Sequence, residues 1–352
     1  MSERRLRIAF DVSATRLGRA GVARSVRAMA EHIGAAPGVE LIPIGGGDAP
    51  PRGTARRRAL ALRLDLEWST RGARRTAAVA GADVLHCPVA RAPLSSGAPP
   101  LLVTVHDLVA VRFPETMSGW NRAYSRATLG RVLAAADAIA AVSTDTADDV
   151  AAFAPAVADR VAVVLQGVDR FWSEPEHAAP LRERPYVLFV GSTEPRKNLP
   201  RLVAAQALRR ARGADEDLVL VGGDAWGGVD LPAEPWLVRL DHADDRSLRL
   251  LYRDAAAVAL PSLHEGTGLP VLEAMAAGAP VVAADAGALP ETCGDAGILV
   301  DPLDVESIAT GIDRAIAERD ALAACGRAQA ATRTWQSTAA AYVELYRRLA
   351  DG

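Results

Sequence analysis

The chain has 352 residues, with 40 Lys or Arg, 43 Asp or Glu and a net charge of -3. Half of the residues are hydrophobic and 24% are charged, an ordinary globular composition that excludes wholesale disorder. Three widely spaced cysteines give neither a disulfide framework nor a zinc pattern, and no apolar stretch reaches the roughly 20 residues that cross a bilayer. We therefore expect a cytoplasmic protein of two domains.

Short apolar runs bounded by Gly, Pro or Asp recur along the chain, as is typical of buried parallel strands. The first half contains six such runs, at 7–12, 40–45, 83–88, 101–107, 138–143 and 161–167. The second half contains six more, at 186–191, 218–223, 236–241, 256–261, 280–285 and 297–302. Helical stretches alternate with the runs, so each half is predicted to be a doubly wound parallel sheet of α/β class.

The polar, proline-containing stretch 173–185 is predicted to link an N-terminal domain, 1–172, to a C-terminal domain, 186–334. Apolar positions at helical spacing predict a closing helix within 335–352, which we expect to pack back on the N-terminal domain. Two facing domains of this kind bind ligands in a cleft at the carboxyl ends of their strands.

The first 80 residues hold 15 arginines and 7 acidic residues, a net charge of +8. The densest part is Arg52–Arg75, where leucines and Trp68 are interleaved with the arginines. This stretch has two interpretations: a surface that docks on an anionic membrane or a phosphorylated acceptor, or a solvated helix face whose arginine stems cover apolar surface. Nucleic-acid binding is disfavoured, because the overall charge balance is acidic and no recognition motif is present.

Arg196 and Lys197 follow the predicted strand at 186–191 and precede a helix. Adjacent cations in such a loop are suited to holding a diphosphate, with the arginine as a planar fork and the lysine as a point charge. Lys197 is also the single lysine among the 40 basic residues. If an ammonium group is required there, replacement by arginine is resisted at that position.

The segment PSLHEGTGLPVLEAMAAGAPVV (261–282) contains a glycine-bearing loop, a proline where a helix would begin, and two glutamates eight positions apart. Free backbone N–H groups at such a helix start favour phosphate. Glu265 lies in the loop, and Glu273 about one turn into the helix, where carboxylates can accept hydrogen bonds from sugar and ribose hydroxyls. Glu273 has apolar neighbours on both sides, so it should have a partner.

These residues carry a resemblance. EGTGLPVLEAMA and GSTEPRKN, together with segments at 136–150, 165–169 and 287–302, resemble glycosyltransferase family 4, most of all its bacterial mannosyltransferase-type members. The resemblance implies the GT-B fold, with two Rossmann-like domains facing across a cleft. It also implies a retaining, metal-independent hexosyltransferase that moves a hexose such as mannose from a GDP- or UDP-sugar to a saccharide or lipid-linked acceptor, in surface polysaccharide or glycolipid synthesis.

The resemblance also assigns residues. The implied catalytic set contacts the donor sugar or neutralises the leaving diphosphate, and consists of His106, Arg196, Lys197 and Glu265. The implied donor-binding set is Gly18, Gly21, Gly266, Thr267, Gly268 and Glu273, in which Glu273 binds ribose hydroxyls and the glycines let backbone approach phosphate. The family often has Phe where Thr267 stands, and Gly near Asp241, so the sugar and the base stay open.

Three further residues at predicted strand ends have open roles. His86 either lines the acceptor side or is structural, and Asp11 and Asp107 are secondary candidates for acceptor contacts. No metal and no cofactor other than the nucleotide-sugar substrate is expected, and the protein would be peripheral to the inner face of the membrane if Arg52–Arg75 docks there. The alternative function is a catalytically silent sugar-nucleotide-binding partner subunit of the same fold.

Overall fold

The structure is a computed structural model that describes residues 4–18, 21–47, 54–70, 72–116, 119–223 and 229–352. The chain divides into two compact units. Unit 1 comprises Met1–Leu108, Trp120–Gln166 and Trp335–Gly352, and unit 2 comprises Val109–Gly119 and Gly167–Thr334. Residues 173–185, predicted as a linker, therefore fall within unit 2, whereas the final helix falls within unit 1.

Unit 1 is built on a six-stranded parallel sheet in the order β2-β1-β3-β4-β5-β6, so all six strands predicted in the first half are confirmed. The strands are β1 (Leu6–Asp11), β2 (Val39–Ile44), β3 (Val84–Cys87), β4 (Leu101–Val105), β5 (Ala138–Ala141) and β6 (Val161–Val163). Its main helices are α1 (Val22–Gly34), α2 (Thr54–Ser69), α3 (Gly72–Val79), α5 (Gly119–Ala135), α6 (Thr144–Phe153) and α13 (Trp335–Asp351).

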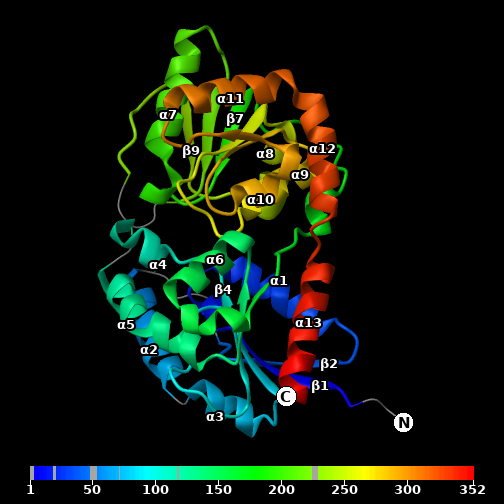
Figure 1. Cartoon of the computed structure of the whole chain (residues 1–352). Helices are drawn as coiled ribbons and strands as arrows, with labels where there is room; N and C mark the ends of the chain where they lie inside the picture. The colour runs from blue at the N-terminus through cyan, green and yellow to red at the C-terminus, as the bar shows by residue number, and fades with distance from the viewer. Residues whose placement is uncertain (1–3, 19–20, 48–53, 71, 117–118, 224–228) are drawn as a thin grey trace. The chain divides into compact units, whose positions relative to one another are not determined.

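The two faces of this sheet are covered by different helices (Figure 1). Ile8 and Phe10 point to the face covered by α1 and α13, while Ala9 between them packs in a second core beneath α2, α3 and α5. This alternation follows from the strand period of two residues. Helix α1 packs on β2, whereas the C-terminal α13 contacts β1 and β3, and the hydroxyl of its Tyr342 lies 2.9 Å from that of Thr104 on β4.

Unit 2 contains a second six-stranded parallel sheet, in the order β12-β11-β10-β7-β8-β9, which confirms the six strands predicted in the second half. The strands are β7 (Tyr186–Val190), β8 (Asp217–Val221), β9 (Leu237–Leu240), β10 (Ala257–Leu260), β11 (Val281–Ala284) and β12 (Ile298–Val300). The helices are α4 (Val109–Arg112), α7 (Leu199–Ala211), α8 (Asp245–Asp254), α9 (Leu269–Ala277), α10 (Leu289–Cys293), α11 (Val305–Ala317) and α12 (Arg319–Ala331).

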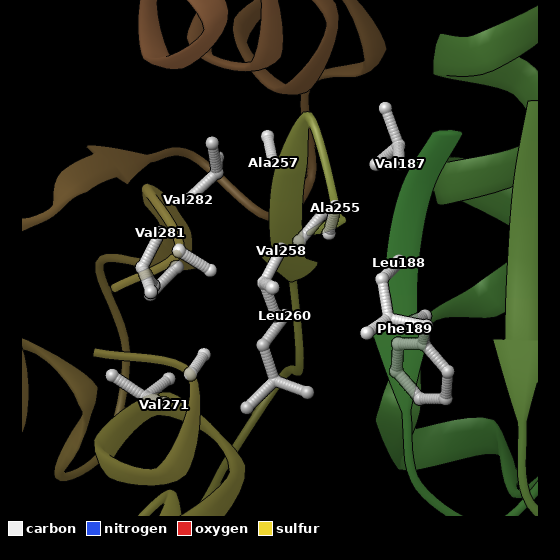
Figure 2. Close-up of a cluster of buried hydrophobic side chains, with 14 of the residues drawn as sticks. Val187, Leu188, Phe189, Ala255, Ala257, Val258, Leu260, Val271, Val281 and Val282 are labelled. Carbon is white, nitrogen blue, oxygen red and sulfur yellow. The ribbon is translucent and has the colours of Figure 1, made fainter. Parts of the chain in front are cut away.

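The core of unit 2 surrounds its two central strands. Figure 2 shows Val258 and Leu260 of β10 beside Val187 and Phe189 of β7, all of them fully buried. Helix α7 packs against α11, and α9 packs against both α8 and α12, so helices form a layer on each face of the sheet (Figure 1). Near-continuous apolar strands are required here, because both faces are covered.

Arg52–Arg75 forms α2 and α3 over its described part; Arg52 and Arg71 lie outside the described residues. Arg74 is buried and donates hydrogen bonds to the backbone carbonyls of Ser95, Gly97 and Pro99. It therefore holds α3 to the loop that precedes β4 and does not contribute a surface charge. Among the described helices, none combines the length and the apolar character needed to span a bilayer.

Candidate functional site

The strongest candidate site in unit 2 lies where its strand order reverses. Strands β7 and β10 are neighbours, yet the chain leaves β7 towards β8 and leaves β10 towards β11 on the opposite side. The loops after both strands therefore diverge at the same edge of the sheet, which is where open α/β sheets bind ligands. The loop after β7 carries Arg196 and Lys197, and the loop after β10 carries Glu265.

Asn198 fastens these two loops together. Its side-chain amide donates to the carbonyl of Pro261, at 2.9 Å, and to that of Pro302, at 2.6 Å. Its backbone is left-handed, with φ of 59°, a conformation that Asn tolerates better than most residues. The turn Pro195–Lys197 ends at this residue, and α7 begins directly after it. Asn198 thus fixes where the preceding cations stand.

Both cations are bound to one carboxylate. The Lys197 ammonium donates to Oε1 of Glu265 at 2.6 Å, and the Arg196 guanidinium donates to Oε2 at 3.1 Å. Arg196 also donates to the carbonyl of His264, at 2.5 Å, and to the carboxylate of Glu194, at 2.8 Å. Lys197 is 8% exposed, so the ammonium lies in a confined position.

The electrostatics of Glu265 follow from this arrangement. Burial opposes ionisation of the carboxyl group, but the charges of Lys197 and Arg196 outweigh it and lower the pKa from 4.5 to about 2. Glu265 is therefore an anion at all ordinary pH values, and the two cations are held in fixed directions by it. Such preorganised cations can stabilise negative charge that develops on a leaving phosphate.

The loop after β10 leads into the start of α9. Gly268 precedes the helix with φ of 76°, and a Cβ there would lie 2.5 Å from a methyl of Leu289, so a side chain is excluded. The hydroxyl of Thr292 donates to the carbonyl of Thr267 at 2.5 Å, which ties the loop to α10. Gly266 lies between Glu265 and Thr267 and is buried. The first turn of α9 thus directs backbone N–H groups towards the same edge as the cations.

Glu273 lies on α9 and is 6% exposed. The hydroxyl of Tyr252, a fully buried residue of α8, donates to Oε2 of Glu273 at 3.1 Å. The sequence predicts that this carboxylate needs a partner among its apolar neighbours, and Tyr252 is one such partner. A carboxylate fixed in this way can accept hydrogen bonds from a diol.

Unit 1 contributes three of the sequence-predicted residues, which stand at the carboxyl end of its own sheet. His106 follows β4; its Nε2–H donates to the carbonyl of Pro88 at 2.9 Å, and its Nδ1 lies 3.4 Å from the side-chain nitrogen of Gln166. Burial lowers the pKa of His106, against the opposing effect of the bond to Pro88, so the ring is neutral at pH 7.

Gly18 and Gly21 lie in the segment between β1 and α1, and a Cβ at either position would meet no atom within 4 Å. Gly21 has φ of 55° and ψ of -129°, a conformation that only glycine adopts readily, and it precedes the first turn of α1. The open space at Gly18 means that no packing contact in unit 1 requires glycine there.

His86 and Asp11 are not available for an acceptor. His86 is fully buried: Nδ1 lies 2.6 Å from the hydroxyl of Tyr346 and Nε2 lies 2.8 Å from that of Thr104, and burial lowers its pKa to about 3. Asp11 is also fully buried and accepts hydrogen bonds from the backbone N–H and hydroxyl of Ser13. Both residues are structural, so the acceptor interpretation of each is wrong.

Sequence reasoning missed three residues that the structure adds to the site of unit 2. These are Glu194, which contacts Arg196, Asn198, which joins the loops, and Tyr252, which contacts Glu273. Asn198 directly follows Lys197 and precedes a Leu-Pro helix start, which is a recognisable signal for a helix-flanking residue. The other two contacts depend on the fold and have no local signal.

Two family models match the chain, one in each half. Residues 184–318 match the model of "Glycosyl transferases group 1", and residues 19–170 match that of "Glycosyltransferase Family 4". O-antigen chain mannosyltransferase B of Escherichia coli is 30% identical over 267 residues, covering 70% of each chain. D-inositol 3-phosphate glycosyltransferase of Nocardia farcinica is 31% identical over 201 residues, covering 51% of this chain but only 45% of that relative.

Among solved structures, Anabaena HepE in complex with UDP and glucose has a TM-score of 0.71 at 18% identity, covering 98% of this chain and 100% of that one. The two six-stranded parallel sheets and these matches define a glycosyltransferase of the GT-B fold. The chain belongs to glycosyltransferase family 4, which confirms the resemblance seen in its sequence motifs.

Proposed function

We propose that this enzyme is a retaining hexosyltransferase that takes a hexose, mannose by preference, from a nucleoside diphosphate sugar. The proposed acceptor is a saccharide or a lipid-linked saccharide in surface polysaccharide or glycolipid synthesis. The mannosyltransferase relative supports the sugar, and the HepE structure with UDP and glucose supports a nucleotide donor. The observation that carries the proposal is the pair of confined cations, Arg196 and Lys197, at the strand-order reversal of unit 2.

The proposed chemistry uses this chain's own groups. Negative charge grows on the β-phosphate as the bond to the sugar breaks, and the guanidinium of Arg196 and the ammonium of Lys197 offset it. N–H groups at the start of α9 supply further hydrogen bonds to the diphosphate. Glu273 binds the ribose hydroxyls, and Glu265 contacts the sugar. With the leaving charge offset by these cations, the reaction needs no metal ion.

The first test is a thermal-shift comparison of GDP, UDP, ADP and TDP. A nucleotide present at 100 times its Kd stabilises the folded state by about 2.7 kcal/mol, which raises the melting temperature by several degrees. Lys197→Ala should abolish most of this shift. Arg212→Ala is the matched control, because Arg212 pairs with Glu306 on the exposed surface of the same unit.

The second test is transfer itself. Release of the nucleoside diphosphate from GDP-mannose or its UDP-linked counterpart should continue in the presence of EDTA, and NMR of the product should show retention of the anomeric configuration. The absence of a thermal shift with all four nucleotides would refute the proposal, whereas a thermal shift without any transfer would favour the catalytically silent sugar-nucleotide-binding partner subunit.

We also propose that α2 docks on an anionic membrane surface while the enzyme works on a lipid-linked acceptor. One side of α2 exposes Leu62 and Leu66, which are 40% and 59% exposed, next to the exposed Arg63. On the opposite side of α2, the side chains of Leu64 and Trp68 are buried. An exposed apolar strip beside an arginine is suited to the boundary between headgroups and acyl chains, although Arg63 is also paired with Glu67 on this side.

Co-sedimentation with vesicles that contain phosphatidylglycerol tests this surface. We expect salt-sensitive binding that is lost in the double variant Leu62→Ser, Leu66→Ser. The control is Leu303→Ser, since Leu303 is 63% exposed on unit 2. Equal binding by both variants, or no binding by the wild type, would leave only the solvated-face interpretation of Arg52–Arg75.

A further inference from the structure

Arg196 is shared between two carboxylates, one from each side. One terminal nitrogen donates to Glu265 at 3.1 Å and to the carbonyl of His264, and the other donates to Glu194 at 2.8 Å. Lys197 is paired with the remaining oxygen of Glu265. The cluster of Glu194, Arg196, Lys197 and Glu265 therefore contains two positive and two negative charges, and its net charge is zero.

The two carboxylates differ in how firmly they are held. Glu265 has both oxygens bound to cations, its side chain is 9% exposed, and its backbone carbonyl accepts from the N–H of Ala288 at 3.0 Å. The Glu194 side chain is 19% exposed, and the structure gives its carboxylate one partner among the described residues, Arg196. Glu194 is therefore the carboxylate that can leave Arg196 at the lower cost.

A diphosphate that binds this loop needs the donors that Glu194 now occupies. A guanidinium recognises phosphate best through two parallel N–H groups, and one of its terminal nitrogens is committed to Glu194. A neutral cluster also attracts an anion less than a cluster with one uncompensated positive charge. Both effects weaken diphosphate binding for as long as Glu194 remains in place.

We propose that Glu194 competes with the diphosphate for the Arg196 guanidinium. Glu194 is paired with the Arg196 guanidinium when no nucleotide is bound, separates from it when the donor binds, and pairs with it again as the nucleoside diphosphate product leaves. Glu194 is thus a positioning residue that limits product affinity and speeds product release. This inference rests on the proposed function, because it assumes that a nucleoside diphosphate binds at Arg196 and Lys197.

The test is the variant Glu194→Gln, which keeps the shape of the side chain and removes its charge. Arg196 keeps its bonds to Glu265 and to the carbonyl of His264 in this variant. We expect the Kd of GDP or UDP, whichever binds the wild type, to fall about three- to tenfold, the range of a partly exposed, charge-assisted pair. The dissociation rate should fall in the same proportion. A gain in affinity is an effect that structural damage does not produce.

Isothermal titration calorimetry and stopped-flow dissociation with GDP and UDP should compare the wild type, Glu194→Gln, Lys197→Ala and Glu306→Gln. Glu306→Gln is the matched control, because it removes one negative charge from an exposed ion pair elsewhere on unit 2. Unchanged or weaker binding by Glu194→Gln overturns the inference, as does an equal gain in Glu306→Gln. If the wild type binds neither nucleotide, or Lys197→Ala binds as the wild type does, the proposed function fails instead.

Discussion

The ion pair between Lys197 and Glu265 can be measured by a double-mutant cycle of Lys197→Met and Glu265→Gln. The two charged atoms are 2.6 Å apart, and their side chains are 10% and 9% exposed, so water screens them little. The fall in the pKa of Glu265 from 4.5 to about 2 corresponds to a net stabilisation of the folded state on the order of 3 kcal/mol, which remains after the opposing cost of burial has been met mainly by Lys197 and Arg196. Arg196 is farther from Glu265, at 3.1 Å, so the coupling with Lys197 should be about 2 kcal/mol at pH 7.

The pH dependence gives a second reading of the same interaction. A carboxyl group with a depressed pKa in the folded state contributes stability that is present above its unfolded-state pKa, near 4.5, and lost as the pH falls towards 2. Between pH 7 and pH 3.5, the difference in free energy of unfolding between the wild type and Glu265→Gln should shrink by about 1.4 kcal/mol.

Urea unfolding followed by tryptophan fluorescence is the assay, since Trp172 is buried in the core of unit 2 and reports its opening. The slope of the transition must be unchanged among the four proteins for the cycle to be valid. A coupling below about 0.5 kcal/mol at pH 7, or a difference from Glu265→Gln that does not vary with pH, would refute the reasoning, because it would place the pair in a water-like environment.

Two further predictions concern residues that the sequence did not single out. Tyr252→Phe removes the hydroxyl that donates to Glu273, so we expect the KM for the nucleotide sugar to rise about tenfold with little change in kcat; an equal fall in kcat at unchanged KM would contradict a ribose-binding role for Glu273. Asn198→Ala loses hydrogen bonds to Pro261 and Pro302 and places a Cβ-bearing residue in a left-handed conformation, which should cost about 2–4 kcal/mol in urea unfolding. Asn198→Gly tolerates that conformation and should be about 1 kcal/mol more stable than Asn198→Ala, so equal stabilities would show that the backbone conformation carries no cost.

The twelve strands were predictable because each is a short apolar run ended by a polar residue, glycine or proline. The runs at 186–191 and 256–261 became β7 and β10, which differ from the predicted bounds by a residue or two at their ends. Because both faces of these strands are buried, apolar and polar residues do not alternate along them. An uninterrupted apolar run is therefore the sequence pattern that indicates a strand of a parallel sheet. Glu265, Arg196 and Lys197 were found because they follow such strands, and parallel strands bring their carboxyl ends to one edge.

Other predictions could not be made from local sequence. His86 and Asp11 end strands just as His106 does, yet they are buried in structural hydrogen bonds. Along β3, His86 points to the face covered by α13, where the hydroxyls of Tyr346 and Thr104 satisfy both of its nitrogens. The partner from α13 is 260 positions away, so no short-range pattern indicates this bond.

The single lysine, Lys197, shows which features the sequence determines and which depend on the tertiary structure. The sequence by itself determined that Lys197 follows a buried strand, stands beside Arg196 and precedes a helix, since strand, loop and helix are encoded by neighbouring residues. Only the tertiary structure decided that its ammonium would meet Glu265, 68 positions later, in a position that leaves the lysine 8% exposed. Pairing between distant loops depends on the order in which strands join the sheet, and that order is set by the packing of the whole unit.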